Sequence, residues 1–425
     1  MATGTGKTLT AINCVINEYQ ITNELKNIIV VPGIELVNQW YQELKVSNFK
    51  MLFKWSSSNS KLNEEVNIIK CLKDSNSLNI IITYDSFISD KFLNIFSNEL
   101  HKYIVVFDEV HEIASIKRKK IISELKFKKL IGLSATPLRL WDENQENLFI
   151  EKLFHSSHPY YTFNYTMEKA INNGFLCQYN YRPYFAYLNE IEFNEYIKLT
   201  SKIPLGKDKI NSHAAIKRQL VLDSALDKQD VFIDILTKMV ENDNYKYTLV
   251  YCPKGKDNEE SRLNNLRMLA SERFPKINTL PFLGISSRRA TRLKQFENGF
   301  TDMLFAIKCL DQGVNIPRTE NAIFLASGKN YREFIQRRGR VLRNYKDNEY
   351  TKMHSNIYDI IVLPTISQFY NQRSIMTKLI YSEFRRFVEF NKLAIFSSST
   401  YRKVQKTLEE YGLTYEFINT QIKKD

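Results

Sequence analysis

Short apolar runs that alternate with helical patterns are the feature of this sequence that most constrains its fold. Four such runs occur within residues 1–155: NIIVVPG, LNIIITYDS, KYIVVFDEV and KLIGLSATP. Each is short, rich in β-branched residues and followed by turn-forming residues, which is typical of strands buried in a parallel sheet. Because a helical pattern follows each run, we expect crossover helices between the strands. The pattern predicts a doubly wound α/β domain over residues 1–155.

A second series of strand-like runs lies within residues 226–365: YTLVYC, TLPFLG, MLFAIKC, NAIFLAS and IYDIIVLP. Residues 156–225 lack this rhythm and are first aromatic and extended, then polar and helical, which predicts a connector with a helical insertion. Residues 366–425 show helical spacing of apolar positions and no further strands. We interpret them as a helical cap on the second domain, with a separate partner-binding module as the alternative. The predicted fold class is α/β, with two tandem parallel-sheet domains and a C-terminal helical segment.

The amino-acid composition limits the kinds of binding partner and the cellular environment that the chain is expected to have. The chain has 60 Lys and Arg against 47 Asp and Glu, a net charge of +13, which favours a polyanionic partner such as nucleic acid, although many basic proteins bind none. Its five cysteines are scattered without a CxxC pair, so neither a zinc site nor a disulfide framework is indicated, and a reducing, cytoplasmic setting fits best. No apolar run approaches the ~18 residues that would span a bilayer, so we expect no membrane partner.

The chain opens with MATGTGKTLT, which fits the end of the phosphate-binding pattern G-x-x-x-x-G-K-[ST]. Gly4 and Gly6, on either side of Thr5, would let the backbone turn tightly and present its N–H groups to phosphate. Lys7 would reach the β- and γ-phosphates, and Thr8 would place a hydroxyl group on Mg²⁺. A plain glycine-rich turn before a helix is the alternative. The loop predicts ATP and Mg²⁺ as ligands.

A pair of acids follows the third strand-like run, in YIVVFDEVHE. The carboxyl ends of parallel strands line the ligand crevice of an open sheet, so Asp108 and Glu109 are expected beside the phosphate loop. There Asp108 would hold Mg²⁺ through water, and Glu109 would polarise the attacking water as general base. A solvated turn after a strand is the alternative interpretation.

Two further segments carry candidate chemistry. GLSATP ends the next strand-like run and offers the hydroxyl groups of Ser134 and Thr136, and FIQRRGRVLR near the end of the second series offers Gln336, Arg340 and Arg343. Arginines are suited to stabilising charge on a phosphoryl group in transfer, and arginines supplied from another domain make hydrolysis depend on domain closure. A basic helix start on the surface is the alternative for the arginine segment.

Taken together, these segments resemble the superfamily 2 helicases, motors built from two RecA-like domains. TGTGKT, DEVH, SAT, LDQGVNIP and QRRGRVLR are similar to motifs I, II, III, V and VI of that family, occur in the family's order and cover roughly residues 1–345. DEVH, VVPGIELVNQW, TYDSF and SGKNYREFIQRRGRVLR resemble the DNA-directed branch. That branch holds the excision-repair helicases of the XPB type and the motor subunits of type I and type III restriction systems.

The resemblance implies roles for individual residues. The residues implied to bind the nucleotide are Gly4, Thr5, Gly6, Lys7, Thr8, Gly313 and Asn315. Those implied to hold the metal are Thr8 and Asp108. Those implied in catalysis are Glu109 as base, Asp108, Gln336 near the γ-phosphate, and Arg340 and Arg343 as arginine fingers. Those implied to couple hydrolysis to movement are His111, Ser134 and Thr136. Those implied to contact nucleic acid are Pro32, Gly33, Gln39, Thr83, Tyr84 and Ser286.

The sequence departs from the family's pattern at three positions in two segments. Gly33 stands where many relatives carry a hydroxyl residue that touches the nucleic-acid backbone, so that contact would have to come from backbone N–H groups or be absent. In motif V, Ile307 replaces a common threonine and Asn315 a common aspartate. These departures put binding strength at those points in question.

The phosphate loop begins at Met1, where relatives often have a methionine preceded by an apolar strand. We therefore expect that an internal methionine has become the start and that the first strand, which should occupy the middle of the first sheet, is missing. Its loss would leave backbone groups and a buried face without partners, and would lower stability and ATP affinity. Intact-mass analysis of the protein made from its own locus tests this expectation, because a native product of 425 residues would refute a misplaced start.

The function expected from the residues and the resemblance is that of an ATP-dependent DNA helicase or translocase. An RNA-directed helicase is the alternative within enzymes. A remnant or subunit that binds nucleic acid or a partner with little ATP turnover is the alternative outside them. No carboxylate cluster typical of a nuclease accompanies the motor motifs, so a nuclease or another subunit is a further candidate partner. As the nucleic-acid partner, DNA is favoured over RNA.

Overall fold

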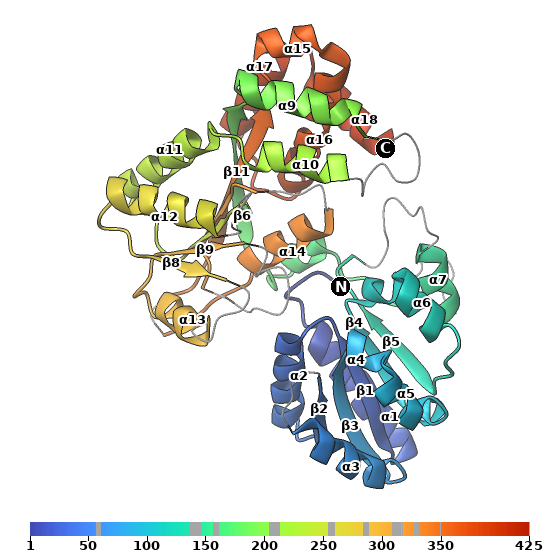
Figure 1. The fold of residues 1–425 in the computed structure, drawn as a ribbon. Helices are drawn as coiled ribbons and strands as arrows, with labels where there is room; N and C mark the ends of the chain where they lie inside the picture. The colour runs from blue at the N-terminus through green and yellow to red at the C-terminus, as the bar shows by residue number, and fades with distance from the viewer. Residues whose placement is uncertain are drawn as a thin grey trace. The chain divides into compact units, whose positions relative to one another are not determined.

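The computed structural model describes residues 1–56, 61–136, 146–155, 161–203, 213–253, 260–283, 289–307, 316, 318–326, 331–348 and 350–424. These residues divide into two compact units, one of Met1–Ala170 and the other of the described residues from Ile171 onward (Figure 1). Each unit contains a sheet of parallel strands with helices on its faces. The predicted α/β class with two parallel-sheet domains is confirmed.

The sheet of the first unit has five parallel strands in the order β2-β3-β1-β4-β5. Its strands are β1 (Leu25–Val31), β2 (Leu52–Trp55), β3 (Ser77–Thr83), β4 (Ile104–Asp108) and β5 (Lys129–Leu133). The four predicted runs form β1, β3, β4 and β5, whereas β2 was not predicted from the sequence. Because the last residues of β1 and β3 are paired, Val31 with Thr83, the loops after these strands start side by side.

Helices cover both faces of the first sheet (Figure 1). The helices and helical turns are α1 (Lys7–Thr22), α2 (Ile34–Val46), α3 (Leu62–Leu72), α4 (Tyr84–Phe87), α5 (Asp90–Phe96), η1 (Leu100–Lys102), η2 (Val110–Ala114), α6 (Ile116–Ile122), α7 (Glu146–Leu153) and α8 (Met167–Asn172). Side chains of α1 and α2 pack with Ile29 and Val106 in one apolar cluster. Side chains of α3, α5 and α7 pack with Ile28 and Val105 in another. Neighbouring residues of one strand thus face opposite clusters, as the pleat of a strand requires.

The first residues of the chain lie beside one edge of the described first sheet, and whether a further strand belongs there stays a prediction. The five strands of this sheet are hydrogen-bonded in an unbroken series, with β5 at the edge. The phosphate loop lies beside this edge, because the Met1 amino group donates to the Ser134 carbonyl at 3.1 Å, one residue past β5. The loop therefore meets the described sheet next to β5.

The sheet of the second unit has six parallel strands in the order β6-β11-β10-β7-β9-β8. Its strands are β6 (Gln178–Tyr187), β7 (Thr248–Tyr251), β8 (Thr279–Phe282), β9 (Met303–Ala306), β10 (Asn321–Phe324) and β11 (His354–Leu363). The five predicted runs form β7 to β11. The stretch predicted to be a connector contributes the sixth strand, since β6 pairs with β11 along its whole length. Pro183 is tolerated within β6 because that strand lies at the edge of the sheet.

The helices of the second unit again cover two faces. They are α9 (Glu190–Ser201), α10 (His213–Asp223), α11 (Lys228–Glu241), α12 (Ser261–Arg273), α13 (Arg289–Glu297), α14 (Tyr331–Val341), α15 (Ile366–Asn371), α16 (Arg373–Asn391), α17 (Ser398–Glu410) and α18 (Tyr415–Lys424). Helices α11 and α12 pack against one face through an apolar cluster that includes Phe232 and Leu263. On the other face the Phe390 ring of α16 lies 5.7 Å from Phe324 and 5.4 Å from Tyr181.

A buried ion pair fastens α16 to β11. The Arg386 Nε atom donates to both carboxylate oxygens of Asp359, at 2.9 and 2.7 Å, and the Tyr181 hydroxyl group donates to Oδ2 at 2.7 Å. Neither charged side chain is more than 3% exposed. Burial opposes the charge of Arg386, but Asp359 and then Glu383 outweigh it and raise the pKa of the guanidinium. Helix α16 of the C-terminal segment is thereby part of the second unit's core.

Replacing Arg386 with methionine is expected to lower the free energy of unfolding by about 3–5 kcal/mol, because Asp359 would remain buried without its countercharge. Chemical denaturation of wild type and variant measures this difference. Arg385→Met, one position along the same helix and only partly buried, is the matched control and is expected to cost about 0.5 kcal/mol or less. Equal losses in the two variants would show that the ion pair does not hold α16.

Candidate nucleotide-binding site

The glycine-rich loop has the backbone geometry that the sequence predicts. Gly4 and Gly6 have φ angles of 83° and 87°, in the left-handed region where a Cβ atom is strained. Helix α1 begins at Lys7 directly after this turn, with Gly6 as its N-cap and no side chain capping it. The first N–H groups of α1 are therefore available to an anion, and the helix dipole favours negative charge there.

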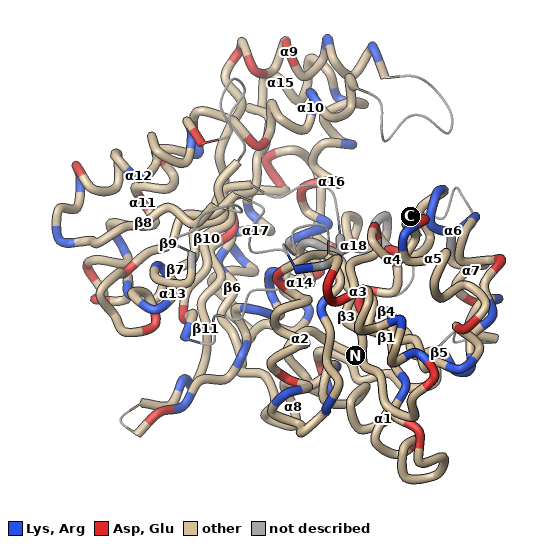
Figure 2. The backbone as a smooth tube through the Cα atoms, turned by 60° about the horizontal axis from the view of Figure 1, so that its bottom comes forward, with Lys and Arg blue, Asp and Glu red and all other residues tan. Residues whose placement is uncertain are grey.

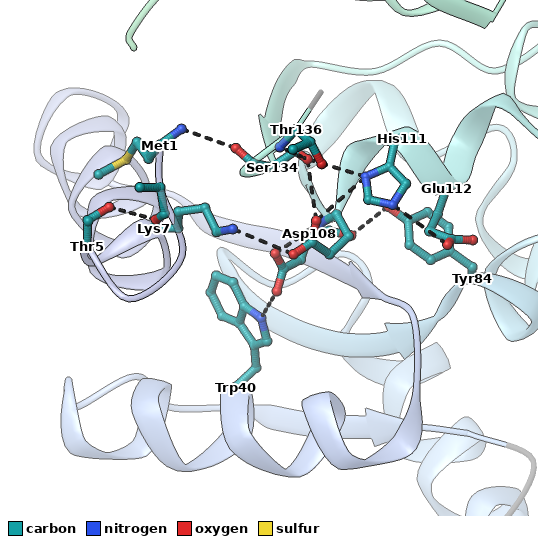
Figure 3. Close-up of polar contacts among 12 residues, drawn as sticks. Met1, Thr5, Lys7, Trp40, Tyr84, Asp108, His111, Glu112, Ser134 and Thr136 are labelled. Carbon is teal, nitrogen blue, oxygen red and sulfur yellow. Dashed lines mark hydrogen bonds and ion pairs between the residues drawn. The ribbon is translucent and has the colours of Figure 1, made fainter. Parts of the chain in front are cut away.

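The two predicted acids lie next to this loop at the carboxyl end of β4 (Figure 3). Asp108 is the last residue of β4, and Glu109 follows it with a φ angle of 51°. A left-handed conformation is uncommon for a residue with a side chain and often occurs at functional sites. Here it accompanies a Glu109 carboxylate whose Oε1 atom lies 3.5 Å from Nζ of Lys7. The loop and the acids thus form one cluster.

The three residues expected to couple hydrolysis to movement belong to the same cluster. The Ser134 hydroxyl group donates to Glu109 Oε2 at 3.3 Å, and His111 Nδ1 lies 3.3 Å from the same hydroxyl oxygen. The backbone N–H of Thr136 donates to Ser134 Oγ at 3.0 Å. A displacement of the segment after β5 would therefore change the surroundings of the Glu109 carboxylate.

Asp108 is held by contacts that the sequence did not reveal. Its Oδ2 atom accepts a hydrogen bond from the indole Nε1 of Trp40 at 2.9 Å, and its Oδ1 atom accepts one from the backbone N–H of Glu109 at 3.0 Å. Burial, followed by the charge of Glu109, raises the pKa of Asp108, whereas Lys7 and the indole oppose that rise. From the sequence alone, Trp40 would be taken for a core residue, because it lies at helical spacing from Val37.

The donor set of this cluster fits a Mg²⁺–nucleotide. Thr8 lies in the first turn of α1 and Asp108 at the end of β4, so a hydroxyl and a carboxylate oxygen, the ligand types Mg²⁺ prefers, are present. Lys7 supplies a positive charge beside the same carboxylates. Among the described residues no group of three or more His, Cys, Asp and Glu side chains is arranged to hold a metal ion by itself.

In the second unit, two arginines of QRRGRVLR form hydrogen bonds that hold α14 in place. Arg337 donates to the Ala326 carbonyl at 3.0 Å, and Arg338 donates to the Glu389 carboxylate at 2.9 Å, so both fasten α14 within the unit. Burial, followed by the charge of Arg340, lowers the pKa of Arg343 to about 10. Gln336 and Arg340 are each 7% exposed. The proximity of Arg340 and Arg343 agrees with their expected joint role, which stays a prediction.

A buried lysine fixes the C-terminal end of α14. The ammonium group of Lys352 donates to the carbonyl oxygens of Val341 and Arg343, and the side chain is 3% exposed. Ser355 Oγ also donates to Val341 O, at 2.9 Å. A cation at this end of a helix interacts favourably with the helix dipole. Lys352 was missed in the sequence because nothing near it marks the residue as buried.

Lys352 is expected to make stability depend on pH. Burial lowers its pKa from 10.5 to about 8, so between these values the folded chain binds fewer protons than the unfolded chain. The free energy of unfolding should therefore rise with pH across this window, by about 3 kcal/mol in all. Below the window, the burial of the charged ammonium group should lower the free energy of unfolding by that full amount. Lys352→Met should lack this rise. Denaturation of both proteins at the two ends of the window checks it, and parallel curves would contradict it.

The residues expected to contact nucleic acid differ in how exposed they are. Pro32, Gly33 and Gln39 are partly exposed after β1 and on α2. Thr83 caps α4, because its side chain accepts from Ser86 N, and it also donates to Ser86 Oγ. Tyr84 is fully buried, which disfavours a direct contact of its side chain, and its implied role in nucleic-acid binding stays a prediction. The positions that lie outside the described residues are Ser286, Gly313 and Asn315.

Comparison with protein families identifies the chain from both units. Residues 1–139 match the family described as "Type III restriction enzyme, res subunit", and residues 227–345 match the family described as "Helicase conserved C-terminal domain". The chain is a superfamily 2 helicase. It belongs to the type that includes restriction motors and XPB proteins, and is thus an ATP-dependent enzyme of nucleic acids.

Individual relatives agree with this assignment. The helicase is 23% identical over 377 residues to the DNA 3'-5' translocase XPB2 of Sulfurisphaera tokodaii, an alignment that covers 82% of this chain and 75% of the relative. Its fold resembles that of the Pyrococcus furiosus Hef helicase domain, with a TM-score of 0.51, 15% identity and coverage of 88% and 94% of the two chains. It also resembles the Type ISP restriction-modification enzyme LlaBIII bound to DNA, with a TM-score of 0.55, 15% identity and coverage of 91% of this chain but 28% of that enzyme.

The described part of the helicase contains no helix that is both long enough and apolar enough to cross a membrane. Lysine and arginine occur on many elements of both units, among them the run KRKK of α6 (Figure 2).

Proposed function

We propose that this helicase is an ATP-dependent DNA translocase that uses Glu109 as general base and Arg340 and Arg343 as arginine fingers. The observation that carries the proposal is the cluster at the carboxyl edge of the first sheet, where the Lys7 ammonium lies 3.5 Å from Glu109 and the carboxylate of Asp108 is adjacent. A phosphate loop beside two acids of different surroundings is what hydrolysis of a phosphoanhydride requires.

In the proposed mechanism each residue of the cluster has a separate task. Lys7 and the N–H groups at the start of α1 would bind the phosphates. Thr8 and Asp108 would hold Mg²⁺, which would supply positive charge beside the phosphoryl group in transfer. Glu109 accepts the proton of the attacking water. Ser134 donates to Glu109 and so keeps its carboxylate oriented. Arg340 and Arg343 stabilise the charge that develops during transfer.

DNA is the proposed track. The relative XPB2 is described as a DNA translocase, and LlaBIII was determined bound to DNA. The net charge of +13 supports a polyanionic partner, and binding through phosphate contacts should weaken steeply as salt is raised. The family matched by residues 1–139 is named for a restriction-enzyme subunit, which supports the proposal that a nuclease or another subunit acts with the helicase.

A triplex-displacement assay tests translocation directly. ATP-dependent release of a third strand from duplex DNA, absent in Glu109→Gln and with ATP omitted, is the expected result. Release of a strand from an RNA duplex alone would replace DNA by RNA as the track. If the wild-type protein binds DNA but releases no strand from either substrate, the translocase proposal is wrong.

A further inference from the structure

Two buried aromatic side chains connect the segments expected to grip nucleic acid with the acid expected to hold Mg²⁺ (Figure 3). Trp40 lies on α2, and its indole N–H donates to Asp108 Oδ2 at 2.9 Å. Tyr84 begins α4, and its hydroxyl group donates to the backbone carbonyl of Asp108 at 2.8 Å. One aromatic residue thus holds the carboxylate of Asp108 and the other holds its backbone.

The positions of the strands explain why both segments reach the same acid. In the first sheet β1 lies between β3 and β4. Val31 and Thr83 end β1 and β3 as a pair, and Val30 is paired with Phe107, the residue before Asp108. The loops that lead into α2 and α4 therefore leave the same edge of the sheet at which Asp108 lies. A shift in either loop is transmitted over a short distance.

Both aromatic side chains are packed tightly enough to act as rigid connections. Trp40 is 2% exposed within the cluster formed by α1, α2 and the sheet. Tyr84 is fully buried, and its ring stacks on that of Phe107 with the two ring centres 6.1 Å apart. The Arg118 guanidinium lies over the Tyr84 ring, 4.9 Å from its centre. Arg118 is in turn bound to Glu112 at 2.6 Å. Close-packed interiors transmit displacements because neighbouring groups have no free space to yield into.

Helix α2 also links the segment after β1 to Trp40, so a displacement at its first turn can reach the indole. Gly33, its N-cap, has no side chain to satisfy the first N–H groups, so these can bind a phosphate of the strand. Trp40 lies about two turns further along the helix, roughly 10 Å along its axis. A helix that moves as a rigid body when its first turn binds phosphate carries the indole with it.

We infer that Trp40 and Tyr84 are positioning residues that couple nucleic-acid binding to the placement of Asp108 in the metal site. This inference rests on the proposed function of the same site. A nucleic-acid strand that binds the segments after β1 and β3 shifts α2 and α4, and each shift is passed to Asp108 through one hydrogen bond. By reciprocity, Mg²⁺–nucleotide bound at Asp108 changes the affinity for DNA by the same factor.

The coupling factor is the measurement that tests this inference. It is the ratio of the DNA dissociation constants with and without a Mg²⁺-bound, non-hydrolysable ATP analogue, obtained by fluorescence anisotropy of labelled duplex DNA. We expect a ratio that departs from one by about tenfold in the wild-type protein. Tyr84→Phe removes one hydrogen-bond donor and keeps the ring, and Trp40→Phe removes one donor and replaces the indole by a smaller aromatic ring. Each should bring the ratio about fivefold or more closer to one.

Matched controls separate a lost contact from a disturbed core. Trp55→Phe changes a buried indole that packs 5.1 Å from Phe92 on the other face of the sheet, and Tyr103→Phe removes a hydroxyl group bonded to the Lys73 carbonyl. Both should keep the wild-type ratio. If Trp40→Phe fails to fold, Tyr84→Phe still tests the inference. A wild-type ratio of one, or an unchanged ratio in folded Trp40→Phe and Tyr84→Phe, would overturn it.

Tryptophan emission gives a second reading without nucleotide. The chain has three tryptophans, Trp40, Trp55 and Trp141, so Trp55→Phe combined with Trp141→Phe leaves Trp40 as the only emitter. Duplex DNA alone should then change the Trp40 emission, and no change on saturation with DNA would refute the part assigned to α2. Loss of ATP turnover in the wild-type protein would refute the proposed function but would leave both of these readings interpretable.

Discussion

Glu109→Gln is expected to lower the rate of ATP turnover by about 10²–10⁴-fold, because glutamine cannot accept the proton of the attacking water. The structure places the carboxylate 3.5 Å from Lys7 and 3.3 Å from the Ser134 hydroxyl group, and glutamine is close to glutamate in size. Nucleotide binding should therefore persist while turnover is lost. Steady-state ATP hydrolysis, together with binding of a fluorescent ATP analogue, measures both quantities.

Glu124→Gln is the matched control for this substitution. It makes the same chemical change at an exposed position after α6, away from the cluster, and should leave turnover unchanged. If Glu109→Gln retained wild-type turnover, another group would have to serve as the base. A variant that lost turnover and nucleotide binding together would instead indicate that Glu109 has a structural part in the loop.

Arg340→Ala and Arg343→Ala are each expected to lower ATP turnover by about 10³-fold or more, the size of effect typical of an arginine finger. Nucleotide binding should change little, since the phosphate loop and both acids belong to the first unit. The same two assays used for Glu109→Gln apply here. The matched control is Lys346→Ala, which removes an exposed positive charge just beyond α14 and should keep wild-type turnover.

The outcome for these arginines differs from that expected for their neighbours. Arg338 donates to Glu389 and to the Tyr179 hydroxyl group, so Arg338→Ala should lower the melting temperature as well as activity. A melting temperature equally low in Arg340→Ala would mean that Arg340 is part of the core instead of a catalytic group. Wild-type turnover in both Arg340→Ala and Arg343→Ala would contradict their assignment as arginine fingers.

Much of the fold follows from local pattern. The runs that became β1, β3 and β4 are apolar on both faces, and such runs indicate buried parallel strands without any knowledge of tertiary structure. The run that became β5 was also predicted to be buried, but only Leu133 of that strand is buried, at the edge of the described sheet. The strand β2 has only four residues, LFKW, too few for a recognisable period. The strand β6 was read as a connector because its sequence mixes polar and aromatic residues and contains Pro183, a composition that an edge strand tolerates.

The candidate site was predictable where chemistry depends on residues close together in sequence. Gly4, Gly6 and Lys7 form a loop, and Asp108 and Glu109 end a strand, so spacing alone indicates a phosphate site and its acids. The contacts of Trp40 and Tyr84 with Asp108 join residues 68 and 24 positions apart, and no local pattern contains them. Both side chains fit an apolar core equally well. Only the arrangement of the strands shows that their polar atoms reach Asp108, the acid proposed to hold the metal.

The arginines of the second unit also show that long-range contacts cannot be predicted from sequence alone. Four arginines occur within eight residues of α14 and its end, and sequence alone gives them one chemical character. The structure shows Arg337 and Arg338 bound to groups of their own unit, and it shows Lys352 at the carbonyl ends of Val341 and Arg343. The partners of Arg337 and Arg338 lie within their own unit, and no local sequence pattern reveals them.

Steady-state ATP hydrolysis by the 425-residue protein, alone and with duplex DNA, single-stranded DNA or RNA, tests the central claim most directly. The account predicts turnover that rises on addition of DNA, rises less or not at all with RNA, and disappears in Glu109→Gln. Turnover that no nucleic acid stimulates, or no turnover at all from a protein shown to be folded and to bind DNA, would contradict it.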